Sequence, residues 1–91
     1  MERTVTVVPD AGLHARPAAE FVKTANEFEC DLTVARVGGN GEVNARSTIA
    51  VTGLGVESGE QVRLVAEGGD AEAALDALEA VLSTPEKGDP E

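Results

Sequence analysis

Alternation of apolar and polar residues predicts strands in three stretches of the chain, residues 3–7, 31–37 and 60–66. A period of two residues is typical of a strand that buries one face and exposes the other. Residues 38–41, Gly-Gly-Asn-Gly, are typical of a hairpin turn, so residues 42–45 are expected to return as a short strand. The sequence therefore predicts four strands, of which the second and third form a hairpin.

Apolar residues at spacings of three and four predict two longer helices, one over residues 15–28 and one that follows Asp70. This spacing gathers the apolar side chains into one stripe that a helix can bury. Ser47 is a favoured N-cap residue, so a short helix is expected to begin there and to stop at Gly53 and Gly55. Asp70 is expected to cap the last helix. The expected stripes are Ala18, Phe21, Val22, Ala25 and Phe28 in the first helix, and Ala71, Ala74, Leu75, Leu78 and Leu82 in the last.

The order of these elements is strand, helix, two strands, short helix, strand, helix (βαββαβα). Strands that alternate need one covered face, so the sequence predicts an α+β fold with a four-stranded antiparallel sheet and three helices on one face. This arrangement is an open-faced β-sandwich. We expect a single domain over residues 1–84 and a flexible polar tail over residues 85–91, which are rich in Pro and Gly.

Cysteine usage and hydropathy narrow the classes of protein that this chain can be. Cys30 is the one cysteine among 91 residues, so neither an internal disulfide nor a thiolate metal cluster is expected. No apolar run approaches the roughly 20 residues that a membrane-spanning helix needs. We expect a cytoplasmic protein that is not embedded in a membrane and that binds no metal.

Acidic residues greatly outnumber basic ones in this chain. Seventeen Asp and Glu stand against seven Lys and Arg, which gives a formal net charge of −10. Such a surface repels phosphate backbones, so nucleic acid is not an expected partner. Because the acids are spread along the whole chain, we expect a host adapted to high salt, where charge is screened. The alternative is a small acidic protein without that adaptation.

His14 is the only histidine, and it stands immediately before the first predicted helix. The N–H groups at a helix start, here those of Ala15 and Arg16, have no partner within the helix and favour an anion such as a phosphoryl group. The Arg16 guanidinium can pair with phosphate oxygens, and Pro17 is tolerated in a first helical turn. These surroundings disfavour an imidazolium and leave a neutral, nucleophilic His14. The pattern predicts a site that accepts phosphate.

Other chemistries fit the sequence less well. Acyl transfer would require a nucleophile, a base and an orienting acid, and no such triad motif is present. A metal site would require more strong ligands than one His and one Cys. The glycines of residues 38–41 join two strands instead of opening a helix, so a hairpin is favoured over a phosphate-binding loop.

The segment Gly12-Leu13-His14-Ala15-Arg16-Pro17-Ala18 resembles the active-site signature of the HPr family, the histidine-containing phosphocarrier proteins of the sugar phosphotransferase system. The resemblance extends from about Thr4 to Thr84, and the order of elements is the same. Leu54-Gly55 and residues 74–78 also resemble that family. The resemblance implies the open-faced sandwich that the periodicity predicts.

The resemblance also implies a reaction. Enzyme I, charged from phosphoenolpyruvate, would phosphorylate His14 at Nδ1, and the group would pass to the IIA domain of a sugar permease, for which a fructose-type permease is one candidate. Arg16 would be the active-site arginine, and Pro17 would shape the helix start. The protein would be a monomeric carrier without a cofactor, and not an enzyme.

Two alternatives remain open at the level of sequence. A carrier for dihydroxyacetone phosphorylation, with a kinase phosphotransfer subunit as acceptor, would have the same site. A regulatory binding protein of the same fold would act without phosphotransfer. The presence of both His14 and Arg16 argues against the regulatory protein, because an adaptor has no chemical need for either residue.

Ser47 falls where some members of the family carry a serine that a regulatory kinase phosphorylates. The alternative is a plain N-cap serine, which would stabilise the helix by about 1 kcal/mol. The residues that follow, Thr48-Ile49-Ala50, are less bulky than the apolar cluster of many family members, and this departure puts regulation at Ser47 in doubt.

A docking surface for partners is expected on the two helices that flank His14. Its charge would come from three of the seven basic residues, and its centre would be apolar. The expected docking residues are the basic Arg16, Lys23 and Arg46, and the apolar Ile49, Val51 and Leu54, although at least one of the three apolar residues is expected to face the core instead.

Overall fold

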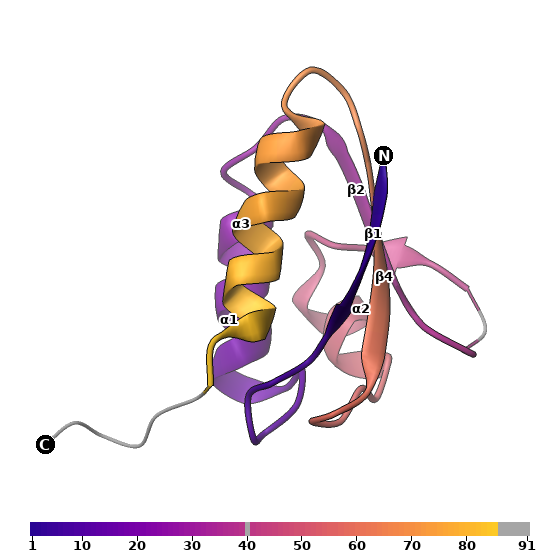
Figure 1. Ribbon diagram of the computed structural model, residues 1–91, viewed down its shortest axis with the longest axis vertical. Coiled ribbons are helices and arrows are strands. Elements are labelled where there is room, and N and C mark those ends of the chain that lie inside the picture. Colours follow the sequence, from indigo (N-terminus) through magenta and orange to yellow (C-terminus); the bar gives the residue numbers. More distant parts are fainter. Residues whose placement is uncertain (40, 86–91) are drawn as a thin grey trace, which may run out of the picture.

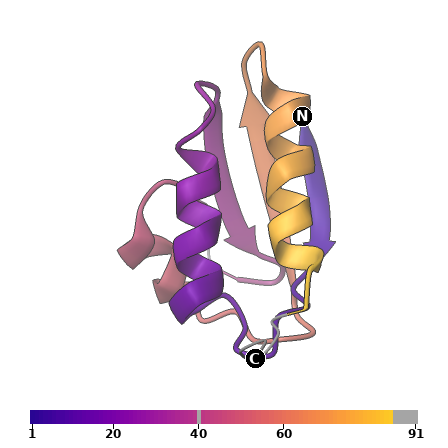
Figure 2. The same ribbon diagram turned by 90° about the vertical axis from the view of Figure 1, so that its left-hand side faces the viewer.

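The computed structural model describes residues 1–39 and 41–85 and contains seven elements in the predicted order (Figure 1). The sheet has the order β1-β4-β2-β3, and every neighbouring pair of strands is antiparallel. Helices α1 and α3 lie side by side along one face of the sheet (Figures 1 and 2). The predicted α+β fold, an open-faced β-sandwich, is confirmed. The elements are β1 (Glu2–Thr6), α1 (Ala15–Ala25), β2 (Asp31–Arg36), β3 (Val43–Asn44), α2 (Thr48–Gly53), β4 (Gln61–Glu67) and α3 (Ala71–Ser83).

The core fills the space between the sheet and the helices. Both predicted helical stripes are buried, apart from Phe28, and Phe21 is the largest side chain that is fully enclosed. The inward side chains of the sheet are at most 4% exposed, which confirms the alternation in the sequence. These inward residues are Val5, Val7, Leu32, Val34, Val62, Leu64 and Ala66.

Helix α1 ends at Ala25, three residues before the expected end at Phe28. Asn26 is its C-cap, and both its backbone N–H and its side-chain amide donate to the carbonyl of Val22, each at 3.0 Å. An asparagine side chain that competes for a helical carbonyl favours the end of a helix over its continuation. Phe28 packs, half-buried, against the core from the loop that follows.

The hairpin after β2 is confirmed as an antiparallel pair, but its second strand is shorter than expected. Strand β3 contains only Val43 and Asn44, which lie opposite Val34 and Thr33. Ala45 leaves the strand and is buried in the core. Asn40 of the expected glycine turn and residues 86–91 of the expected tail lie outside the described residues.

Asp70 occupies the N-cap position of α3, but the expectation that its side chain caps the helix is wrong. The carboxylate instead accepts hydrogen bonds from the backbone N–H groups of Glu29, at 3.0 Å, and Cys30, at 3.1 Å. These amides, that of Glu29 above all, hold the pKa of Asp70 below its ordinary value. Asp70 therefore attaches the start of α3 to the loop that leads into β2.

The Asp70 contact should make stability depend on pH. The pKa of Asp70 is lower in the folded protein than in the unfolded chain. The carboxylate therefore contributes fully to the free energy of unfolding above the unfolded pKa near 3.9, and this contribution is lost as pH falls through the folded pKa. We expect Asp70→Asn to lower the urea midpoint at pH 7. At about pH 3 the difference in urea midpoint between the variant and wild type should be smaller. Asp10→Asn, at an exposed acid without a hydrogen-bond partner among the described residues, is the control. An equal loss at both pH values would contradict a role for the charge.

Candidate functional site

His14 is the N-cap residue of α1, as predicted, with an extended backbone (φ −137°, ψ 168°). Its imidazole makes no capping hydrogen bond and is 35% exposed, so the ring is accessible to a second protein. The first helical bond runs from the Ala18 N–H to the His14 carbonyl. Pro17 has no N–H, and the structure gives the N–H groups of Ala15 and Arg16 no acceptor among the described residues. The helix start therefore offers two donors beside the ring.

Ala15 adopts an unusual backbone conformation between His14 and Arg16. Its φ is +50°, and it is the only non-glycine residue with positive φ in the part of the chain that the structure describes. The left-handed region costs an L-residue about 1–2 kcal/mol, so the surrounding contacts must enforce it. The side chains of Pro17 and Ala18, both buried, anchor the first turn of α1 directly after it.

The loop that carries His14 packs backbone to backbone against residues 56–58. Gly12 has φ +75°, and a Cβ on it would lie 2.6 Å from the Val56 carbonyl oxygen and 3.0 Å from the Glu57 Cα. The Leu13 N–H donates to the same Val56 carbonyl at 3.0 Å, while the Leu13 side chain is fully buried. Only glycine can lie this close to the backbone of residues 56–58. Gly12, the first residue of the motif, therefore determines the position of the loop that carries His14.

Glu57 places a carboxylate next to the imidazole. Its Oε2 lies 3.9 Å from His14 Nε2, and its side chain is 71% exposed. The other ring nitrogen, Nδ1, has no partner among the described residues. The sequence analysis did not single out Glu57, because one acid among seventeen carries no signal. The structure therefore adds a charged neighbour to the predicted constellation.

A family model described as "PTS HPr component phosphorylation site" matches residues 1–84 of the chain. The chain belongs to the HPr family of the phosphotransferase system. Members of this family are phosphocarriers, which agrees with a site whose imidazole is accessible to a second protein.

Individual relatives support the same assignment. The chain is 66% identical over 86 residues to the phosphocarrier protein HPr of Haloferax volcanii, covering 94% of this chain and 97% of that protein. It is 50% identical over 68 residues to a multiphosphoryl transfer protein of Vibrio cholerae, covering 74% of this chain but 17% of that protein. The crystal structure of HPr from Bacillus anthracis superposes with a TM-score of 0.85 at 38% identity, covering 91% of this chain and 96% of that chain.

Ser47 caps α2 in this HPr-family protein, as the sequence predicts. Its Oγ accepts a hydrogen bond from the Ala50 N–H at 3.2 Å, and its carbonyl accepts from the Val51 N–H at 2.9 Å. The hydroxyl is thus part of the helix start, and the residue is half-buried. Regulation through phosphorylation of Ser47 stays a prediction.

Two of the expected docking residues are corrected by the structure. Val51 is fully buried, because α2 turns this side chain toward the core, so it offers no surface to a partner. Arg46 lies in the turn before α2 and not on a helix. Its guanidinium donates to the carbonyls of Phe28 and Cys30, the latter at 2.9 Å, so it holds the loop before β2 in place, and the residue is half-buried.

The other expected docking residues remain at the surface. Arg16 and Lys23 are exposed on α1, Ile49 is 85% exposed on α2, and Leu54 is half-buried directly after α2. Helix α1 packs against α2, so these side chains belong to neighbouring elements. An exposed isoleucine beside two cations is suited to a protein contact with an apolar centre.

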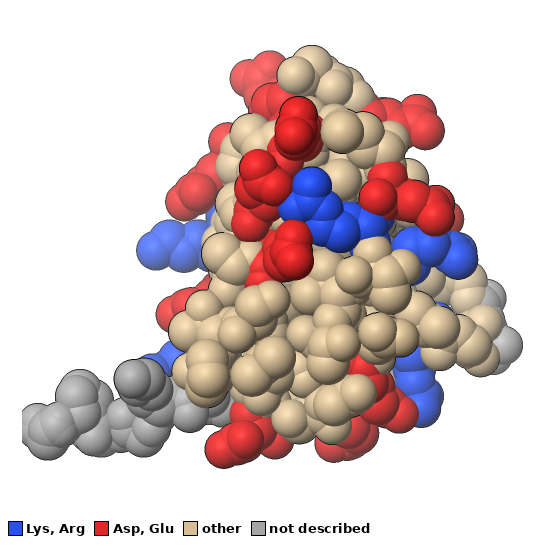
Figure 3. Space-filling model, viewed as in Figure 1, with Lys and Arg blue, Asp and Glu red and all other residues tan. Residues whose placement is uncertain are grey.

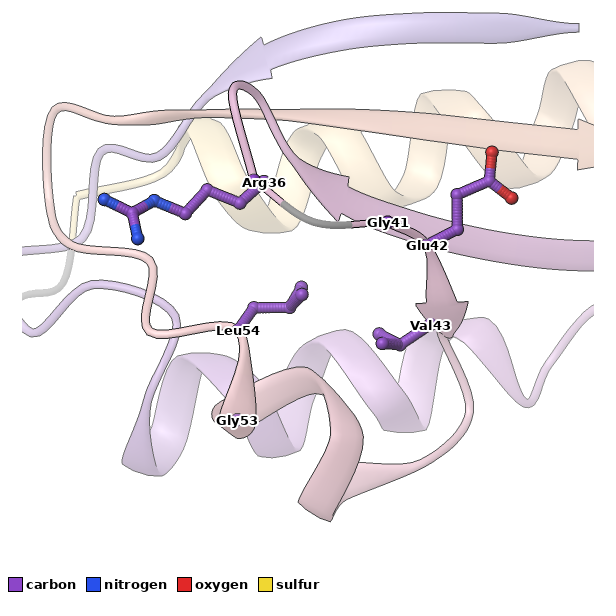
Figure 4. Close-up of a pocket in the computed structure, with 7 residues that line it drawn as sticks. Arg36, Gly41, Glu42, Val43, Gly53 and Leu54 are labelled. Carbon is purple, nitrogen blue, oxygen red and sulfur yellow. The ribbon is translucent and has the colours of Figure 1, made fainter.

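Leu54 is half-buried because its side chain borders a cleft between the end of α2 and the turn after β2 (Figure 4). In Figure 4 the side chains of Leu54 and Val43 point toward one another from opposite sides of the cleft. Neither His14 nor Arg16 is among the lining residues. The cleft is therefore separate from the imidazole.

Acidic side chains cover much of the surface, as the composition predicts. In Figure 3 red atoms cover more of the upper half of the face than blue atoms do, and the blue group near its centre lies against red ones. Arg3 pairs with Asp76 at 2.6 Å and Glu79 at 2.9 Å, and Arg36 pairs with Glu60 at 2.9 Å. The structure gives no such ion pair to Arg16 or Lys23 within the ranges it describes, so their charge stays available, Arg16 at the start of α1 next to His14 and Lys23 in its last turn.

Membrane-spanning helices and metal sites are both absent from the residues that the structure describes. No helix there combines the length and the apolar character that crossing a membrane requires. No group of three or more His, Cys, Asp or Glu there is arranged to hold a metal ion.

Proposed function

We propose that this HPr-family phosphocarrier accepts a phosphoryl group from Enzyme I on Nδ1 of His14 and passes it to the IIA domain of a sugar permease in the cytoplasm. The observation that carries the proposal is the accessible imidazole at the N-cap of α1, beside two backbone N–H groups without a partner in the described chain. The family assignment supports a phosphocarrier, and the geometry supports this histidine as the acceptor.

The chemistry requires one bond to form and one to break. The lone pair of Nδ1 attacks phosphorus, and the bond between phosphorus and the donor breaks, so that the donor atom keeps its electron pair. The transferred group brings negative oxygens to the start of α1. There the phosphoryl oxygens can accept hydrogen bonds from the amides of Ala15 and Arg16, and the helix dipole stabilises their negative charge. The Arg16 guanidinium forms an ion pair with the same oxygens. In the second transfer the phosphorylated His14 is the donor. A nucleophile of the acceptor attacks phosphorus, and the bond between phosphorus and Nδ1 breaks, so that Nδ1 recovers its lone pair.

The buried ring of Pro17 and the positive φ of Ala15 support this geometry. Together they fix the direction in which α1 begins, and with it the position of the Ala15 and Arg16 amides, which have no acceptor among the described residues. Donors that are held in place before the reaction stabilise charge without a cost of reorganisation at the moment of transfer.

Recognition of both partners would use one surface, because a carrier must present the same nitrogen to donor and acceptor. Arg16 and Lys23 would attract acidic partner faces, and Ile49 and Leu54 would supply apolar contact. In high salt the charge attraction is screened, so the apolar contact would carry more of the affinity.

A phosphotransfer assay tests the proposal. The purified protein is incubated with Enzyme I and phosphoenolpyruvate, and candidate acceptors are then added separately: a IIA domain, or the phosphotransfer subunit of a dihydroxyacetone kinase. We expect one acid-labile phosphate per chain, which the IIA domain discharges. Discharge by the kinase subunit alone would replace the sugar permease as the acceptor, and absence of labelling would overturn the carrier proposal.

A further inference from the structure

Glu57 is the acidic side chain that faces the ring of His14, and its place is determined by the backbone around it. The Glu57 N–H donates to the Glu60 carboxylate at 2.9 Å, and the Glu60 N–H donates to the Glu57 carbonyl at 3.0 Å. Glu60 in turn pairs with Arg36 on β2 at 2.9 Å. The first of these contacts is also the main reason that the pKa of Glu60 lies below its ordinary value. Glu57 therefore belongs to a cross-linked turn.

The same turn is attached to the loop that carries His14. The Gly59 N–H donates to the Val7 carbonyl at 2.7 Å, and Ser58 Oγ donates to the Val8 carbonyl at 3.3 Å. On the other side of Glu57, the Val56 carbonyl accepts from Leu13. Contacts on both sides of Glu57 thus hold its Cα at a fixed distance from His14, although its side chain is exposed.

We propose that Glu57 is a positioning residue for His14: its carboxylate accepts a hydrogen bond from the Nε2–H group, which keeps the proton on Nε2 and leaves Nδ1 with the lone pair. This inference rests on the proposed function, because it names how the same imidazole is oriented. The separation of 3.9 Å between Oε2 and Nε2 is longer than a hydrogen bond, and such contacts commonly tighten when a partner docks.

Glu57 also suits the charge that develops during the transfer. As Nδ1 gives its lone pair to phosphorus, the ring becomes positive while Nε2 keeps its proton, and a carboxylate beside that N–H stabilises the product. The other charged groups in the segments that meet here are Arg16 in the first turn of α1, Asp10 in the loop before His14, and Glu60, which accepts from the Glu57 N–H. Helix α2 (Thr48–Gly53) contains no charged residue, and neither do the last residues of α3, 80–83.

The test uses Glu57→Ala and Glu57→Gln, with Glu72→Ala as a control that removes an exposed acid at the start of α3. Nitrogen NMR of His14 reports which ring nitrogen carries the proton, and it requires no other protein. We expect wild type and the control to hold the proton on Nε2, Glu57→Ala to show a mixture, and Glu57→Gln, which keeps an acceptor, to recover most of the wild-type signal.

The phosphotransfer rate provides the second measurement. We expect Glu57→Ala to slow labelling by Enzyme I about two- to fivefold, the range for an exposed charge contact, and the control to match wild type. An unchanged proton position and rate in Glu57→Ala would overturn the inference while leaving the carrier proposal intact. A shifted proton position without any labelling of wild type would overturn the carrier proposal but not the role of Glu57.

Discussion

Replacing His14 by alanine should abolish the acid-labile phosphate that Enzyme I and phosphoenolpyruvate add to the wild-type protein. The loss should be complete, because Nδ1 is the nucleophile and no second histidine exists in the chain to replace it. Intact-mass spectrometry before and after brief acid treatment measures the label directly, since a phosphate on nitrogen is lost in acid whereas a phosphate on serine is retained.

The variant should remain folded, so that the loss can be assigned to chemistry. The His14 side chain makes no capping hydrogen bond, and substitutions of that kind usually change stability by less than about 0.5 kcal/mol. Thermal unfolding of His14→Ala beside wild type checks this. Ser47→Ala is a suitable second control, since it weakens a helix cap but should keep the label. Acid-labile phosphate on His14→Ala would show that the acceptor has been misplaced.

Replacing Gly12 by alanine should cause a large loss of stability. The residue has φ +75°, and the new Cβ would lie 2.6 Å from the Val56 carbonyl oxygen, which already accepts a hydrogen bond from the Leu13 N–H. Strain of the backbone and the steric clash each cost about 1–3 kcal/mol, so we expect a decrease of about 3 kcal/mol in the free energy of unfolding. Urea denaturation followed by circular dichroism measures it.

Gly53→Ala is the matched control for this substitution. Gly53 ends α2 without a positive φ, and a Cβ there meets nothing within 4 Å. Its effect should stay within about 1 kcal/mol in either direction. A loss at Gly53 as large as that at Gly12 would indicate a general intolerance of added methyl groups and would contradict the close approach described here.

Periodicity and local motifs were sufficient to predict the fold. The strands alternate because one face is covered, and the stripes of α1 and α3 are long enough to define a buried side. Helix α2 is different, because six residues make fewer than two turns and do not define a face. The sequence therefore does not indicate which of Ile49, Val51 and Leu54 faces the core, and the structure shows that it is Val51.

The errors at Arg46 and Asp70 have a common physical cause. Both side chains bond to backbone groups of the loop around Phe28, Glu29 and Cys30, which is distant from each of them in sequence. From the local sequence alone, Arg46 is expected to be a cation at the surface, and Asp70 is expected to cap the helix that follows it. Which acceptor or donor is actually nearest depends on how the chain packs.

The site was predictable in part for the same reason. His14, Arg16 and Pro17 are neighbours in the sequence, so their placement at the helix start followed from one short motif. Glu57 enters the site only through the packing of Gly12 on Val56, and the positive φ of Ala15 has no signature, since Gly or Asn would be the usual residue there.

The strand order also determines when the molecule can become functional during synthesis. The first strand pairs only with β4, so that Glu2 lies opposite Val65, and β4 is also a neighbour of β2. Residues 56–60, which hold the His14 loop, immediately precede β4 in the chain. A nascent chain on the ribosome thus lacks the strand that joins β1 to β2, and the support for its histidine, until residues 56–67 have emerged. Because the histidine is made early and ordered late, partners meet an ordered His14 only after β4 has been synthesised.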